Sequence, residues 1–143
     1  MAIPVKSEKH AQARKAVERL HSEARSAAEF MKGITVLLNE QMLKYNWVGF
    51  YMLESGANPP VLVLGDYQGA MTPHTRISLH QGICGAAASS GKTVIVDDVS
   101  KDSRYLACSL ETKSEIVVPI FVRGEVAGEL DIDRKSTRLN SSH

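Results

Sequence analysis

The two cysteines of the chain are the residues with the clearest capacity for chemistry. Cys84 lies in the sequence GICG and Cys108 in RYLACSLETKSEIVVPI, so each thiol has a loop-like setting beside polar residues. A free cysteine is usually a buried small hydrophobe, whereas an accessible one can carry redox chemistry through its thiolate. The zinc-binding spacings CxxC and HxxxH are absent from the sequence, so we predict neither a metal site nor a cofactor.

The composition indicates one globular domain. Hydrophobic residues make up 43% and charged residues 23% of the 143 residues, which is enough for a single core. The net charge is +1, with Lys and Arg scattered among Asp and Glu. This pattern argues against nucleic-acid and membrane partners and favours small neutral or zwitterionic ligands.

The N-terminal residues lack the apolar core of a signal peptide, and no run approaches the roughly twenty apolar residues of a membrane span. We therefore expect a cytoplasmic protein. In that reducing compartment two cysteines are expected to stay free or to form a transient catalytic disulfide.

The elements that must position these thiols begin with two amphipathic helices, predicted from residue 7 to about residue 44. Ala, Glu, Lys and Arg are abundant there, and a break is expected near residues 26–28 or at Gly33. The apolar residues that recur at three- and four-residue steps are Val17, Leu20, Met31, Ile34, Leu38 and Met42.

After these helices, β-prone runs alternate with turns, which predicts an α+β domain with antiparallel hairpins. A small-residue helix is expected at 82–90, and a long polar connection at 98–114 contains Cys108 and a helical turn near 103–107. A loop of this length is more often functional than structural. The predicted strands are 47–53, 61–67, 76–79, a buried strand at 93–97, 115–122 and 125–133.

The last residues, DRKSTRLNSSH from Asp133 onward, are polar and lack any apolar face. They look like the translation of a sequencing adapter, so residues 134–143 are interpreted as a non-native tail. The native chain is expected to continue beyond this point. The predicted domain is residues 1–133, with N-terminal helices in 1–45 and a sheet core with active-site loops in 46–133.

Six short segments in a fixed order carry a family resemblance. They are WVGFY at 47–51, HTRI at 74–77, GICG at 82–85, AC at 107–108, SEIVVP at 114–119 and DID at 131–133. Together they resemble the free methionine-(R)-sulfoxide reductases, which are built on a GAF domain. The resemblance runs from about Asn46 to Asp133. It implies a central antiparallel sheet with the N-terminal helices on one face, and a C-terminal helix that this chain lacks.

The resemblance implies roles for the cysteines. Cys108 matches the family's nucleophile and Cys84 matches a second family cysteine, whereas the third, usually assigned as the resolving thiol, would fall where this chain has His74. Cys84 is therefore the candidate substitute within the chain. Gly82 and Gly85 bracket Cys84 at a predicted helix start, where backbone N–H groups and the helix dipole favour an anion or a thiolate.

Three carboxylates match family residues that hold the substrate amino group: Glu115, Asp131 and Asp133. Their placement supports this role independently. Asp131 and Asp133 are two apart on one strand and share a face, and Glu115 opens the strand expected to pair with theirs. Clustered carboxylates repel one another unless a cation or a shared proton compensates, and an ammonium-bearing ligand would do so.

Trp47 and Tyr51 match the family's aromatic pocket for the substrate methyl group. Residues 47, 49 and 51 share one strand face, so the small Gly49 is expected to leave room for a ligand between the aromatic rings.

Functions of different classes stay open at this point. The resemblance implies an L-methionine (R)-S-oxide reductase, in which Cys108 forms a sulfenic acid and a thioredoxin-type dithiol restores the thiols. The alternative is a non-catalytic GAF module that binds a small molecule or senses redox state in signalling, and His74 favours this second function. A passive scaffold that forms a homodimer through the N-terminal helices is the third hypothesis.

Overall fold

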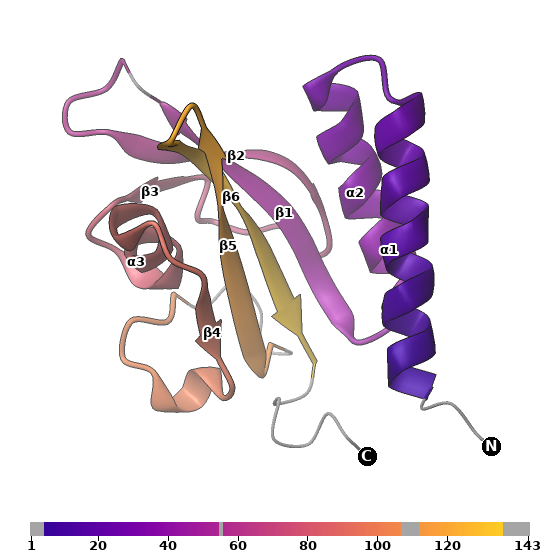
Figure 1. Cartoon of the computed structure of the whole chain (residues 1–143). Helices are drawn as coiled ribbons and strands as arrows, with labels where there is room; N and C mark the ends of the chain where they lie inside the picture. The colour runs from indigo at the N-terminus through magenta and orange to yellow at the C-terminus, as the bar shows by residue number, and fades with distance from the viewer. Residues whose placement is uncertain (1–4, 55, 107–111, 136–143) are drawn as a thin grey trace.

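The computed structural model describes residues 5–54, 56–106 and 112–135. Cys108 and residues 136–143 of the expected tail lie outside this range. Within it, helices and strands follow the order expected of an α+β domain (Figure 1). The elements are α1 (Val5–Glu23), α2 (Ala27–Gln41), β1 (Tyr45–Glu54), β2 (Val61–Gln68), β3 (Arg76–Ser78), α3 (Gly82–Ser90), β4 (Val94–Val96), the 3-10 helix η1 (Val99–Lys101), β5 (Ser114–Val122) and β6 (Glu125–Arg134).

The strands form one six-stranded sheet in the order β3-β2-β1-β6-β5-β4, and every neighbouring pair is antiparallel. Two hairpins supply most of it, as the sequence predicts. The β5–β6 turn uses Arg123 and Gly124, both with positive φ (53° and 81°), which is the geometry of a tight hairpin turn. β1 and β6, which are distant in sequence, become central neighbours.

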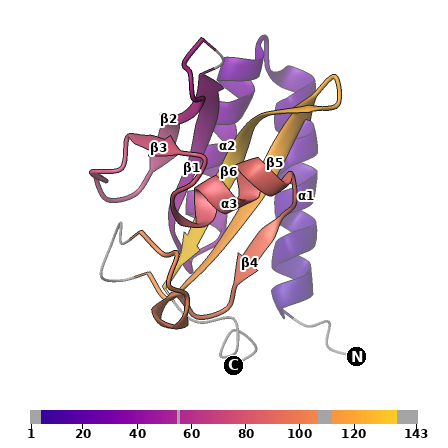
Figure 2. The same ribbon diagram turned by 90° about the vertical axis from the view of Figure 1, so that its left-hand side faces the viewer.

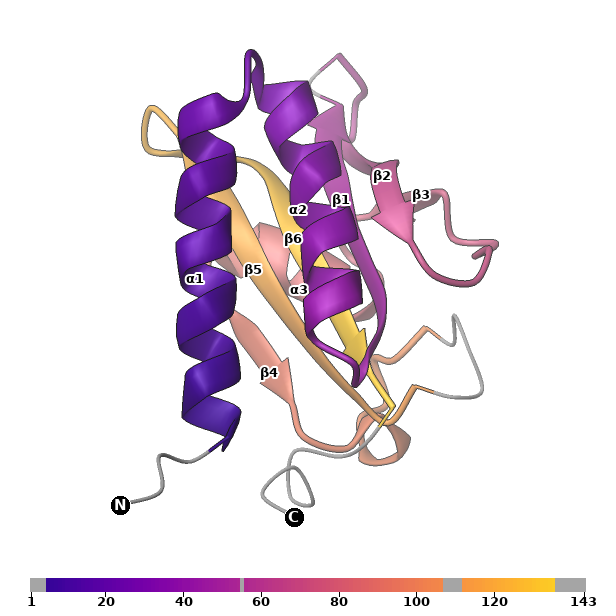
Figure 3. The ribbon, with the colours of Figure 1, turned by 90° about the vertical axis from the view of Figure 1, so that its right-hand side faces the viewer.

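The helices cover opposite faces of the sheet. α1 and α2 lie over one face, where α2 contacts β1 and β2 while α1 packs on α2 (Figure 3). α3 lies over the other face (Figure 2). Because successive side chains of a strand alternate between faces, β1 is buried on both, with Val48 and Phe50 on the side opposite to Trp47 and Tyr51.

The break between the N-terminal helices falls at Ser26 rather than at Gly33, which lies inside α2. Ser26 Oγ accepts a hydrogen bond from the backbone N–H of Glu29 (3.0 Å), and Glu29 Oε2 accepts one from the N–H of Arg25 (3.4 Å). The first contact is an N-cap, which satisfies an N–H group that the helix start leaves without a partner, and the second ties Glu29 to the residue before the cap. Gly33 instead allows close packing, since a Cβ there would lie 2.7 Å from a methyl group of Leu20.

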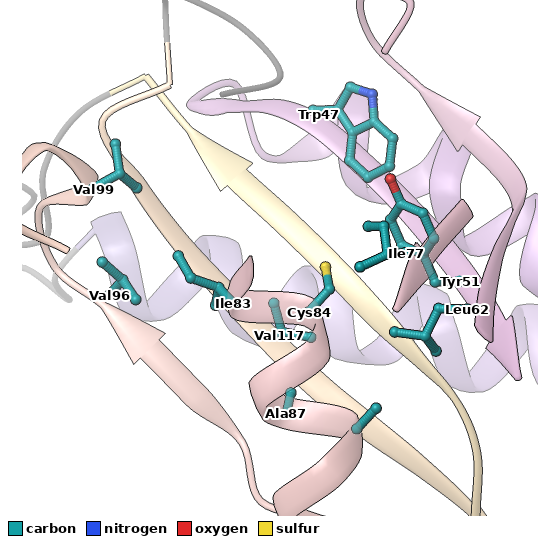
Figure 4. Close-up of a cluster of buried hydrophobic side chains, with 11 residues drawn as sticks. Trp47, Tyr51, Leu62, Ile77, Ile83, Cys84, Ala87, Val96, Val99 and Val117 are labelled. Carbon is teal, nitrogen blue, oxygen red and sulfur yellow. The ribbon is translucent and has the colours of Figure 1, made fainter. Parts of the chain in front are cut away.

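A cluster of buried apolar side chains lies between α3 and the sheet (Figure 4). Its members come from almost every element on this face, so α3 is fixed against β1, β5 and the segment after β4. Those drawn and labelled are Trp47, Tyr51, Leu62, Ile77, Ile83, Cys84, Ala87, Val96, Val99 and Val117.

Two local predictions are wrong. The strand expected to be buried is β4, at the edge of the sheet, and Ile95 is 52% exposed because no described element covers the outward face there. The helical turn lies at Val99–Lys101, where the Asp98 side chain accepts a hydrogen bond from Ser100 N–H (3.0 Å). Residues 103–106 form no helix, and residue 107 of the predicted turn lies outside the described residues. Arg134, assigned to the tail, ends β6 opposite Tyr45 and Ser114.

Among the described residues, no helix is both long enough and apolar enough to cross a membrane.

Gly85 controls how closely α3 approaches the loop after β3, so its replacement should destabilise the fold. A Cβ at this position would lie 2.8 Å from the carbonyl oxygen of Ser78 and 3.1 Å from that of Leu79. We expect Gly85→Ala to lower the free energy of unfolding by about 1–3 kcal/mol, because the backbone must shift. Urea unfolding measures this loss. The matched control is Gly56→Ala, whose Cβ would meet nothing within 4 Å; equal losses in both variants would contradict the prediction.

Candidate active site

Carboxyl groups line the face of the central strands that α3 covers. Glu129, Asp131 and Asp133 alternate along β6 and therefore share one face. Glu115 at the start of β5 pairs with Asp133. All four are buried, with exposed fractions of 6% for Glu115, 0% for Glu129, 2% for Asp131 and 0% for Asp133. The antiparallel register thus gathers acidic groups from distant parts of the chain into one closed space.

Cys84 joins this cluster from the first turn of α3. Its Sγ lies 3.4 Å from Asp131 Oδ2, and the side chain is 5% exposed. Burial raises the pKa of the Cys84 thiol well above its usual value, and the charges of Asp131, Glu115 and Glu129 raise it further. The expectation of a stabilised thiolate at this helix start is therefore wrong, since desolvation and nearby carboxylates outweigh the helix dipole.

Burial also governs the carboxyl groups. It is the main reason that the pKa values of Glu115 and Asp133 are raised well above their usual range. Asp131 raises the pKa of Glu115 further, whereas a hydrogen bond with Asp133 lowers it, and Glu115 raises the pKa of Asp133. The pKa of Glu129 is raised by burial to about 8, with a weak contact to the Cys84 thiol acting in the opposite direction. The cluster therefore holds protons near neutral pH.

The aromatic residues of β1 hold the segment between β2 and β3. Trp47 Nε1–H donates to the carbonyl oxygen of Ala70 (3.1 Å), and the Tyr51 hydroxyl donates to that of His74 (2.7 Å). The Trp47 ring stacks on the rings of Tyr67 and Tyr51, with centroids 5.4 Å and 6.2 Å apart. Both residues thus fix the position of a loop that borders the site.

The space above Gly49 is taken by Trp47. A Cβ on Gly49 would lie 2.4 Å from Cη2 of the indole and 2.8 Å from Cβ of Tyr67. The expectation that Gly49 leaves room for a ligand is therefore wrong. Glycine is needed here because the indole lies flat across the strand backbone.

A small cavity opens between α3, β1 and the carboxyl cluster. Its volume is about 10 Å³, roughly what one water-sized sphere needs. The cavity is lined by Tyr51, His74, Ile77, Ile83, Cys84, Leu106, Glu115 and Asp131.

The predicted site residues thus divide into groups. Tyr51, Cys84, Glu115 and Asp131 meet at the cavity, together with His74. Trp47 and Asp133 are buried beside it without lining it. Thr112 Oγ1 donates a hydrogen bond to Asp133 Oδ2 (3.5 Å). The predicted nucleophile Cys108 lies outside the described residues.

Glu129 is the site residue that the sequence analysis missed. It stands two residues before Asp131 and four before Asp133, so the alternation that places those two on one face includes it as well. Its register partners are Tyr51 on β1 and Pro119 on β5. Extending the period-two pattern back along β6 would have found it.

The sheet has six antiparallel strands and helices on both faces, and a buried cluster of thiol and carboxyl groups lies beneath one helix. These features define a small α+β domain with a buried polar site. The GAF domain family model matches residues 26–143, and the chain belongs to this family.

Individual relatives are consistent with the assignment. The chain is 41% identical over 111 residues to GAF domain-containing protein A of Dictyostelium discoideum (78% of this chain, 66% of the relative). It is 45% identical over 89 residues to the free methionine-R-sulfoxide reductase of Saccharomyces cerevisiae (62% and 48%). The chain thus spans less than two thirds of either relative.

Among solved structures, the chain is similar to that of the free methionine-R-sulfoxide reductase from Neisseria meningitidis in complex with its substrate. The TM-score is 0.81 at 32% identity, covering 94% of this chain and 80% of that one.

The raised pKa of Glu129 should make stability fall as pH rises. In the unfolded chain the carboxyl group titrates near its ordinary value of 4.5, and in the folded protein near 8. The contribution of Glu129 to the free energy of unfolding is complete below its unfolded-state pKa. It is lost as the pH rises through its folded-state pKa, and the loss is about 5 kcal/mol at most. Glu115 and Asp133 act in the same direction.

The measurement is the free energy of unfolding from pH about 5 to about 8. Glu129→Gln should flatten the decline, because its side chain does not ionise. Glu125→Gln is the control, since Glu125 begins the same strand and is exposed. An unchanged decline in Glu129→Gln would refute the assignment.

The Cys84 thiol should resist alkylation in the folded protein. The Cys108→Ser variant leaves Cys84 as the single cysteine of the chain. At neutral pH we expect iodoacetamide to modify the folded variant at least about tenfold more slowly than the same variant in denaturant, because a buried protonated thiol is a poor nucleophile. Mass spectrometry over time gives both rates, and equal rates would contradict the burial and protonation of Cys84.

Proposed function

We propose that this domain reduces free methionine-(R)-sulfoxide, with Cys108 as the nucleophile. The observation that carries the proposal is the meeting of Cys84 with Glu115 and Asp131 at one cavity, with Asp133 directly behind them. Two similar proteins are named for this activity, and one was solved with its substrate bound. We infer that the ligand is a small zwitterion with an ammonium group.

The carboxyl cluster supplies what such a ligand requires. An ammonium group between Glu115 and Asp131 offsets the repulsion that otherwise keeps protons on the cluster, and it gains charge-assisted hydrogen bonds. Tyr51 and Ile77 provide apolar surface on the opposite wall for the thioether end. Since the cavity measures about 10 Å³, the substrate enters only when the half-buried His74 and Leu106 move aside.

The chemistry follows from thiol reactivity. The Cys108 thiolate attacks the sulfoxide sulfur, the sulfur–oxygen bond breaks, and the oxygen passes to Cys108 as sulfenic acid while methionine leaves as the thioether. The oxygen takes up one proton in this step. The buried carboxyl group of Glu115 is a suitable donor, because its raised pKa favours the protonated form.

Return to the thiol state requires a second thiol. We propose that Cys84 condenses with the sulfenic acid, releasing water and forming a disulfide, which a thioredoxin-type dithiol then reduces by exchange. The raised pKa of Cys84 slows this condensation, because the thiolate is the attacking form. His74 cannot replace a resolving thiol, since it carries no sulfur.

A second candidate is a non-catalytic module that binds a small molecule or senses redox state in signalling. The protonated, buried state of Cys84 and the histidine at position 74 favour it over a complete thiol cycle.

We further propose that residues 1–133 form the functional unit in a reducing cytoplasm and that 134–143 are non-native. Homodimerisation through α1 and α2 stays a proposal.

The test is an assay of methionine-(R)-sulfoxide reduction driven by dithiothreitol. We expect turnover by the parent chain, loss in Cys108→Ser, and a fall in kcat/KM of about 10- to 100-fold in Asp131→Asn, because one charge-assisted contact to the ammonium group is lost. Glu125→Gln is the matched control and should retain full activity.

The reductase, which needs only thiols and no cofactor, and the non-catalytic binding module predict different results for the same protein variants. Cys84→Ser should keep turnover with dithiothreitol and lose it with thioredoxin, because an external dithiol can reduce the sulfenic acid directly. Binding of the sulfoxide without turnover under either donor would refute the reductase and leave the binding module.

A further inference from the structure

We propose that the cavity also binds one thiophilic divalent cation, with Zn²⁺ as the reference ion, through Cys84, Glu115, Asp131 and Glu129. Binding of a cation is a different function from the proposed reduction of a sulfoxide, and it does not depend on that activity. It occupies the same side chains, so a bound cation would exclude an ammonium ligand and block the Cys84 thiol.

The spacing of the ligand atoms fits a single ion. Cys84 Sγ and one carboxyl oxygen each from Glu115 and Asp131 all lie within 4.8 Å of one another. A tetrahedral zinc ion with ordinary Zn–S and Zn–O bonds sets its sulfur and oxygen ligands about 3.5 Å apart. Cys84 Sγ and Asp131 Oδ2 already lie 3.4 Å apart. Glu129 does not belong to this group, so its carboxyl group has to approach for it to bind the same ion.

The charge of the site also favours a cation. Cys84, Glu115 and Asp131 are all at least nine-tenths buried. A thiolate ligand selects zinc or cadmium over magnesium and calcium, which prefer oxygen donors alone.

Glu129 provides an independent indication of a ligand. It is 0% exposed, and neither of its carboxyl oxygens has a hydrogen-bond partner by distance and angle among the described residues. Its carboxyl group is directed toward the cluster, where it makes a weak contact with the Cys84 thiol. A buried carboxyl group without a partner is costly, and coordination to a cation would satisfy it.

The cavity has the size of an ion and not of an amino acid. A volume of about 10 Å³ admits one atom-sized ligand without rearrangement. His74 and Leu106, which are half-buried, are the more exposed lining residues and border the route inward.

The experiment titrates Co²⁺, and separately Zn²⁺, into the reduced full-length chain without substrate. We expect one equivalent of Co²⁺ to produce the charge-transfer absorption of a cobalt–thiolate bond, and one equivalent of Zn²⁺ to displace it. Cys84→Ser should abolish the band, whereas Glu129→Gln should keep it with about tenfold weaker binding. Cys108→Ser and Glu125→Gln should leave the band and the affinity unchanged.

The site is refuted if Cys84→Ser retains the band, or if Cys108→Ser is the variant that loses it. Circular dichroism and thermal melting show whether Cys84→Ser folds. If it does not, Glu129→Gln is the deciding variant. An unchanged Co²⁺ affinity in Glu129→Gln would overturn the proposed ligand set. Because no sulfoxide is present, failure here is distinct from failure of the reductase assay.

Discussion

The pairing of β6 between β1 and β5 is the constraint on which the rest of the structure depends. It places Asp131 opposite both Gly49 and Val117, and Asp133 opposite both Trp47 and Glu115. One strand face thereby receives acidic groups that water can hardly reach. Burial disfavours the charged form of each group, so it raises the pKa values of Glu115, Asp133 and the Cys84 thiol.

The sequence could predict the β5–β6 part of this pairing because that part rests on local rules, whereas the pairing of β6 with the distant β1 is not encoded locally. A tight turn at Arg123-Gly124 fixes a hairpin register, and period-two alternation puts residues 131 and 133 on one face. Glu129 obeys the same alternation and was accessible to the same reasoning. The two helices before the sheet followed from periodicity, and the Ser26 N-cap, which accepts from Glu29 N–H, fixes where the second begins.

Other features depend on tertiary contacts that no local pattern encodes. The Trp47 ring lies over Gly49 because Tyr67, from β2, and Ala70, from the following loop, hold it there. The state of the Cys84 thiol depends on a competition between helix dipole and desolvation, and only the burial beneath β6 decides it. Ile95 is exposed because β4 is the last strand of the sheet, which is a property of topology and not of residue type.

The hydrogen bond from Tyr51 to residue 74 reaches the backbone carbonyl and not the imidazole. The loop is therefore anchored at a point that every amino acid possesses. Exchanging the side chain at 74 leaves that anchor in place, so the fold tolerates different chemical groups facing Cys84 at one fixed location. Divergence at this position could alter what the domain does in a lineage of related chains while leaving the surrounding architecture the same.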